Sequence, residues 1–281
     1  MKQLKMKTIT YEFNVGVKQP VNFFVFSDLH ITEDLDTEVL TALYRRAKRC
    51  NPDAILFLGD MIDTVEFLDK EKNYKLLKNF LEQMAMVAPV YIIVGNHDMR
   101  SIPGKRKRRM FVKEPKDFWK DITKNPNIEI LKNQAIKTDK YFLAGIEQGP
   151  SCYNLSEGTS ASTLQKHILV SEKAEMMEVA LKRFLKKVKA PKNTEKPRIL
   201  LVHSARFLTE RNLGGLVKDY DVILSGHLHN MAMSEKVFRK MMAVWGLGLK
   251  NGHLVCPPVT AFTDPKKQRH YTRYCAIVKI K

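Results

Sequence analysis

Two histidines one residue apart, His227 and His229, stand in the stretch SGHLHN directly after the apolar run YDVIL. Alternate residues of a strand point to the same side, and a tight turn opened by a glycine can also aim two side chains at one point. Neutral imidazole is the commonest side-chain ligand of metal ions in proteins. A lone HxH motif is equally consistent with two surface or core histidines, so the choice depends on the rest of the chain.

Four further apolar runs end in the same kinds of side chain. The motifs that follow them are DLH (28–30), GDMID (59–63), GNHD (95–98) and HS (203–204). The carboxyl ends of strands in an open α/β sheet are where ligands bind, because the connecting loops converge there. Each motif alone is short enough to arise by chance, but five of them in this order indicate one metal-binding site.

The elements that must position these motifs follow an α/β pattern. Apolar runs alternate with amphipathic stretches, and apolar residues at helical spacing predict helices over 36–49, 70–86 and 172–189. Between 125 and 146 short alternating runs predict a second sheet with antiparallel pairing, and 244–281 is also typical of strands and turns. We therefore expect a single domain over residues 1–281, in which two packed sheets have helices outside.

Composition limits the class of protein. The chain has 281 residues, 44% of them apolar, and a net charge of +18, which attracts phosphate groups but also serves solubility. Its four cysteines are far apart and form no zinc-binding spacing. No run reaches the roughly 18 apolar residues of a membrane span, and the N-terminus lacks a signal-peptide pattern. We expect a cytoplasmic protein.

Together, the motifs resemble those of the calcineurin-like metallophosphoesterase superfamily, whose pattern is DxH, GDxxD, GNH(D/E), a later His and GHxH. The resemblance extends from residue 28 to 229. It implies a two-sheet β-sandwich flanked by helices in α/β/β/α layers, and two divalent metal ions, Mn, Fe or Zn. By position, one ion would be held by Asp28, His30, Asp60 and His229, and the second by Asp60, Asn96, His203 and His227.

The resemblance also implies a reaction. A hydroxide bridging the two ions would attack a phosphomonoester or phosphodiester directly, without a covalent enzyme intermediate. His97 would act as general acid on the leaving oxygen, and Asp63 would orient its imidazole and raise its pKa. Asp98 is expected to stabilise a loop or support the ligands rather than to bind metal.

Two segments are candidates for substrate recognition. The basic stretch 101–113 follows His97 closely, and we interpret it as a flap in which Arg106, Arg108 and Arg109 contact a phosphorylated small molecule, a lipid phosphate or an anionic membrane surface. A solvated loop is the alternative. The polar insertion 149–167 is either a cap over the site or a long surface loop. Peripheral membrane attachment and the oligomeric state stay open.

Two other functions compete with this interpretation. A metal-dependent nuclease would suit the basic charge, but the chain shows no clear aromatic and basic platform for nucleic acid. A non-catalytic scaffold that binds a protein partner would be expected to lose ligand or catalytic residues, whereas His97 and all seven ligands are present. Serine/threonine phosphatases of the superfamily carry arginine directly after GDxxD, and Thr64 in that place disfavours this subset.

Overall fold

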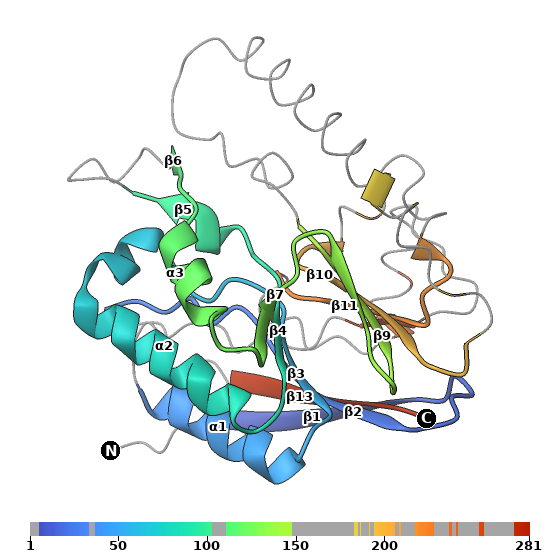
Figure 1. Cartoon of the computed structure of the whole chain (residues 1–281). Helices are drawn as coiled ribbons and strands as arrows, with labels where there is room; N and C mark the ends of the chain where they lie inside the picture. The colour runs from blue at the N-terminus through green and yellow to red at the C-terminus, as the bar shows by residue number, and fades with distance from the viewer. Residues whose placement is uncertain are drawn as a thin grey trace.

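The computed structural model describes most of the chain. The described residues are 6–33, 37–102, 111–147, 183–184, 186, 191, 194–205, 208, 217–227, 236–237, 240, 253–255 and 273–281. They form two large sheets and a group of helices (Figure 1). No helix in these ranges is long and apolar enough to cross a membrane.

The first sheet holds the strands that end in the first three motifs. Its order is β1 (Met6–Phe13), β13 (Arg273–Ile280), β2 (Val21–Phe26), β3 (Ala54–Phe57), β4 (Val90–Ile92) and β7 (Ile128–Ile130). All pairs are parallel except β13 with β2. Because β2, β3 and β4 run in one direction, the motifs after them emerge at the same edge of the sheet.

The second sheet holds the strands before the two later motifs. Its order is β12 (His253–Val255), β11 (Val222–Ser225), β10 (Arg198–Val202), β9 (Phe142–Ile146) and β8 (Gln134–Lys137). The strands from β9 to β12 pair in parallel, and β8 pairs antiparallel to β9. The expected second sheet is therefore confirmed.

The pairing predicted for residues 125–146 is wrong in part. Only β8 and β9 pair antiparallel there, whereas β7 joins the edge of the first sheet, parallel to β4. Burial explains the difference, because Ile128 and Ile130 belong to the same core as Val90 and Ile92 of β4. Alternation of apolar residues identifies a strand but not its partner.

The helices cover the face of the first sheet that is turned away from the second sheet (Figure 1). They are α1 (Glu38–Cys50), α2 (Glu71–Ala85) and α3 (Lys116–Ile122), with single turns η1 (Val65–Asp69) and η2 (His97–Met99) and a short hairpin, β5 (Arg100–Ser101) with β6 (Phe111–Val112). The helices predicted over 36–49 and 70–86 are confirmed. Residues 172–189 lie outside the described residues apart from 183, 184 and 186, which are helical.

Strand β2 shows how its sequence divides the core. Phe24 and Phe26 point into the core beneath the helices, whereas Phe23 and Val25 point into the core shared with the second sheet. Successive side chains of a strand face opposite ways, so a continuous apolar run such as VNFFVF is buried on both sides. The described residues therefore form a helical layer and two stacked sheets. The expectation of a single domain over the whole chain stays a prediction.

Candidate metal centre

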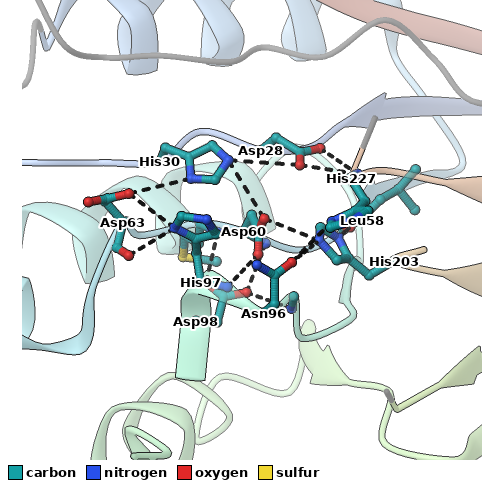
Figure 2. Close-up of polar contacts among 12 residues, drawn as sticks. Asp28, His30, Leu58, Asp60, Asp63, Asn96, His97, Asp98, His203 and His227 are labelled. Carbon is teal, nitrogen blue, oxygen red and sulfur yellow. Dashed lines mark hydrogen bonds and ion pairs between the residues drawn. The ribbon is translucent and has the colours of Figure 1, made fainter. Parts of the chain in front are cut away.

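The loops after five strands bring potential metal ligands together (Figure 2). The loops after β2, β3 and β4 carry Asp28, His30, Asp60 and Asn96, and those after β10 and β11 carry His203 and His227. Six of the seven predicted ligands thus lie in one place, supplied by both sheets. The seventh, His229, lies outside the described residues.

Asp60 lies at the middle of this cluster and is fully buried. Its Oδ1 atom accepts the backbone N–H of His97 at 2.8 Å. Its Oδ2 atom is buried and accepts no hydrogen bond, although His203 Nε2 is 3.2 Å away and His30 Nε2 is 3.6 Å away. A buried carboxylate oxygen without a donor is costly unless a cation neutralises it. This oxygen lies where it can serve two cations at once.

One group of ligand atoms surrounds Asn96. Its Oδ1 atom is 3.2 Å from His203 Nε2 and 3.1 Å from His227 Nδ1. The His203 Nδ1 atom is 2.6 Å from the carbonyl oxygen of Leu58, to which it donates its proton. That hydrogen bond fixes the tautomer, so Nε2, which lies near Asn96 and Asp60, is the nitrogen that can act as a ligand.

A second group of ligand atoms surrounds His30. Its Nε2 atom is 3.9 Å from Asp28 Oδ1 and 3.6 Å from Asp60 Oδ2. Potential ligand atoms of Asp60, His203 and His227 also lie within 4.8 Å of one another, and so do those of His30, Asp60 and His97, although His97 is not among the predicted ligands. Asp60 belongs to both groups.

The charges in the cluster fit bound cations. Burial opposes the charged form of Asp60, yet the His203 and His30 imidazoles keep the pKa of this carboxyl low. Burial likewise opposes a charged His203, but the Asp60 carboxylate raises the pKa of that imidazole to about 9. Metal–ligand bonds of about 2.0–2.2 Å put neighbouring ligand atoms roughly 3 Å apart, close to the spacings around Asp60 and Asn96.

The backbone of the ligand loops is unusual. Four of the six clustered residues have left-handed φ angles, namely Asp28 (53°), His30 (45°), Asp60 (58°) and His227 (68°). Residues other than glycine rarely adopt this region, and such conformations gather at functional sites. The pair Asp28 and His30 therefore does not owe its common direction to a continuing strand. Hydrogen bonds from their amides to the Gly59 and Asp60 carbonyls, 2.9 and 3.1 Å long, join the loops.

Gly95 allows two of these loops to approach each other. A Cβ atom at this position would collide with the carboxylate and the backbone nitrogen of Asp60. No side chain fits between the loops, so the glycine of the GNHD motif is required by packing.

Asp98 joins the same loops through hydrogen bonds to their backbone amides. It is fully buried, and its Oδ2 atom accepts the amides of Asp60 and Gly95, both at 2.9 Å. Its Oδ1 atom accepts the amides of Met61 at 2.7 Å and Ile62 at 3.3 Å. One carboxylate thus holds four backbone donors from the loops after β3 and β4, which agrees with the loop-stabilising role expected for it.

His97 and Asp63 lie beside the cluster and contact each other (Figure 2). The His97 Nδ1 atom is 3.0 Å from both the carbonyl oxygen and the Oδ1 atom of Asp63. Burial lowers the pKa of His97, but the hydrogen bond with Asp63 and the charge of Asp60 outweigh it and raise the pKa. The imidazole is therefore oriented with Nδ1 toward Asp63 and Nε2 available for proton transfer.

Comparison with known proteins identifies the family. The family model described as calcineurin-like phosphoesterase matches residues 21–231, about three quarters of the chain. The chain belongs to the calcineurin-like phosphoesterase family. The family implies divalent metal ions and a phosphate-ester substrate.

Individual relatives of this calcineurin-like phosphoesterase are distant. An uncharacterised metallophosphoesterase of Campylobacter jejuni is 24% identical over 232 residues, which make up 82% of this chain and 49% of the relative. The chain thus spans about half the length of that curated relative. A dimetal phosphatase from Danio rerio of known crystal structure is 9% identical, with a TM-score of 0.45 over 86% of this chain and 88% of that one.

Several predicted features of this calcineurin-like phosphoesterase lie outside the described residues. These are Arg106, Arg108 and Arg109, the insertion 149–167 and His229. Of the proposed flap over 101–113 the structure describes only the ends, near β5 and β6. One residue that the motifs did not single out lies beside the site, because Arg100 Nη1 is 3.8 Å from Asp63 Oδ1. The sequence could have pointed to Arg100 only through its position directly after the GNHDM segment.

Proposed function

We propose that this calcineurin-like phosphoesterase hydrolyses a phosphomonoester or a phosphodiester at a dinuclear metal centre. The observation that carries the proposal is the buried Oδ2 atom of Asp60, which accepts no hydrogen bond and lies between two imidazole nitrogens. The proposed ligands are the six clustered residues, Asp28, His30, Asp60, Asn96, His203 and His227, together with His229. When bound, two divalent ions would lower the pKa of a water nucleophile and neutralise the phosphoryl oxygens.

Hydrogen bonds from residues around the cluster orient the proposed ligands. Leu58 holds His203 with Nε2 facing Asp60, and the His227 amide donates to both Asp28 oxygens at 3.1 Å, which orients that carboxylate. These hydrogen bonds keep the ligand atoms aimed at the centre before any substrate enters.

Proton transfer to the leaving group is assigned to His97. Its Nδ1 proton points at Asp63, so the Nε2 proton is the one available for the departing oxygen. Hydrolysis breaks the bond between phosphorus and that oxygen, and the Nε2 proton neutralises the alkoxide as it forms. Asp63 stays ionised, because the hydrogen bond with His97 and the charges of His97 and Arg100 keep its pKa low despite its burial. It thereby stabilises the imidazolium from which the proton leaves.

Hydrolysis of p-nitrophenyl phosphate and of bis-p-nitrophenyl phosphate tests this function. Protein stripped of metal and reloaded with Mn is compared with His97→Ala and Asp60→Asn, and the bound metal is counted for each. We expect His97→Ala to keep its metal and to lose at least about a hundredfold in turnover on an alkyl phosphate ester, whose leaving oxygen needs a proton, and less on the nitrophenyl esters. We expect Asp60→Asn to lose metal and turnover together.

The exposed carboxylate Asp69 supplies a matched control. Its side chain is 63% exposed and pairs with Lys113, so Asp69→Asn removes the same charge at the surface instead of in the buried cluster and should leave both metal content and turnover unchanged. The preferred substrate separates a monoesterase from a diesterase. Two bound ions with no turnover on either compound would contradict a general phosphoesterase.

A further inference from the structure

Arg100 places a cation next to the proposed general acid. It begins β5, and its Nη1 atom is 3.3 Å from His97 Nδ1 and 3.8 Å from Asp63 Oδ1. Its side chain is 25% exposed, so part of it reaches solvent. The function proposed above uses this residue only through its charge, which helps to keep the pKa of Asp63 low.

The hydrogen-bond donors of Arg100 are largely unused. A guanidinium has five N–H donors. The Arg100 Nε atom is buried and has no hydrogen-bond partner, and the 3.8 Å contact with Asp63 is longer than a hydrogen bond. His97 Nδ1 already directs its proton at two oxygens of Asp63, so it cannot also accept from Arg100. In the described part of the chain this cation has no acceptor oxygen within hydrogen-bond distance.

The backbone of Arg100 is held independently of its side chain. Arg100 pairs with Val112 in the β5–β6 hairpin. The next residue, Ser101, donates its hydroxyl to the Glu66 carboxylate, and the Ile102 amide donates to Glu66 Oε1 at 3.1 Å. Because Glu66 belongs to η1, which follows Asp63 closely, the guanidinium and Asp63 are positioned by one local unit.

We propose that Arg100 binds the phosphoryl group of the substrate, donating from its guanidinium to a phosphoryl oxygen. The inference rests on the proposed function. Guanidinium groups match phosphate oxygens geometrically, and an incoming anion would satisfy donors that the protein itself leaves unused. The Arg100 charge also offsets that of Asp63, which would otherwise repel a phosphate.

Binding of inorganic phosphate to the Mn-loaded protein tests this inference without requiring turnover. Calorimetry is carried out on the wild type, Arg100→Ala and Arg100→Lys, and phosphate is also used as a competitive inhibitor of ester hydrolysis. Hydrogen bonds to charged groups are strong enough that Arg100→Ala should weaken phosphate binding about tenfold or more and raise KM similarly. Arg100→Lys should retain part of the affinity, because lysine keeps the charge but not the fork of donors.

Lys113 supplies a matched control from the same hairpin. Its ammonium is 3.8 Å from Asp69 and 57% exposed, so Lys113→Ala removes a positive charge without approaching the cluster. We expect its phosphate affinity to stay within about twofold of the wild type, because an exposed pair contributes little. Added guanidinium ion should restore part of the binding to Arg100→Ala but leave His97→Ala unaffected.

Three results would overturn the assignment. They are an unchanged phosphate affinity in Arg100→Ala with a lowered kcat, an equal loss of affinity in Lys113→Ala, and a loss of bound metal in Arg100→Ala. The first would make Arg100 a positioning residue that acts through Asp63. If the wild type binds phosphate but hydrolyses no ester, the proposed function fails while the comparison of affinities still decides the role of Arg100.

Discussion

Substitution of Asp98 by asparagine tests how the ligand loops are held. The carboxylate accepts four backbone amides, two on each oxygen. An asparagine of the same shape keeps one oxygen, so two of these buried amides lose their acceptor and face an NH₂ group instead. Leaving a buried donor unsatisfied costs about 1–3 kcal/mol, which gives about 2–6 kcal/mol for two.

A second effect reduces this loss. Burial and the Asp60 carboxylate raise the pKa of Asp98, so they offset part of the stabilisation that the backbone amides give to its negative charge. A neutral amide removes that repulsion, so the lower half of the range applies, about 2–4 kcal/mol. Such a loss is a large fraction of the roughly 5–15 kcal/mol that stabilises an ordinary folded protein.

Urea unfolding of the metal-free protein measures the change. We expect a lower midpoint for Asp98→Asn and an unchanged midpoint for the exposed Asp69→Asn. Because Asp98 supplies no ligand atom in our assignment, the folded variant should still bind two ions when Mn is in excess, only more weakly. An unchanged midpoint would refute the view that Asp98 holds the loops. Loss of one ion at unchanged stability would instead make Asp98 a ligand.

Two further outcomes follow from the geometry of the centre. Gly95→Ala should lose metal on dialysis, because its Cβ atom would collide with Asp60. Gly16→Ala should keep its metal, because a Cβ atom there would meet no atom within 4 Å. Equal retention of metal in both variants would contradict the packing argument. Mn should raise the unfolding temperature of the wild type, because a ligand at a hundred times its Kd adds about 2.7 kcal/mol of stability. The rise should be far smaller in Asp60→Asn. Calorimetric scans that show the same rise for both proteins would place the metal elsewhere.

The motifs allowed the ligand cluster to be predicted because strand ends and metal-ligand residue types are local signals. Buried strands in parallel carry their loops to one edge, so the approach of Asp28, Asp60 and Asn96 could be foreseen without knowing the strand order. The same reasoning could not show that His203 and His227 come from the other sheet, because strand pairing depends on contacts between residues far apart in the chain.

Other features left no local signal. The left-handed backbone at His30 depends on contacts with the loop after β3, and the edge position of β7 depends on packing beneath α2 and α3. Arg100 escaped notice because an arginine in a basic stretch looks like any other until its donors can be checked for partners. In each case the deciding information is tertiary, whereas the motifs report only the ends of elements.

The origin of the ligands in two different sheets has a mechanical consequence. Asp28, His30, Asp60 and Asn96 move with the first sheet, and His203 and His227 move with the second. The two sheets are stacked through an apolar layer that includes Leu56, Leu143 and Leu201. A slight sliding of one sheet over the other would change the separation of the two groups of ligand atoms. The packing of this apolar layer therefore helps to set the distance between the two groups of predicted ligand atoms.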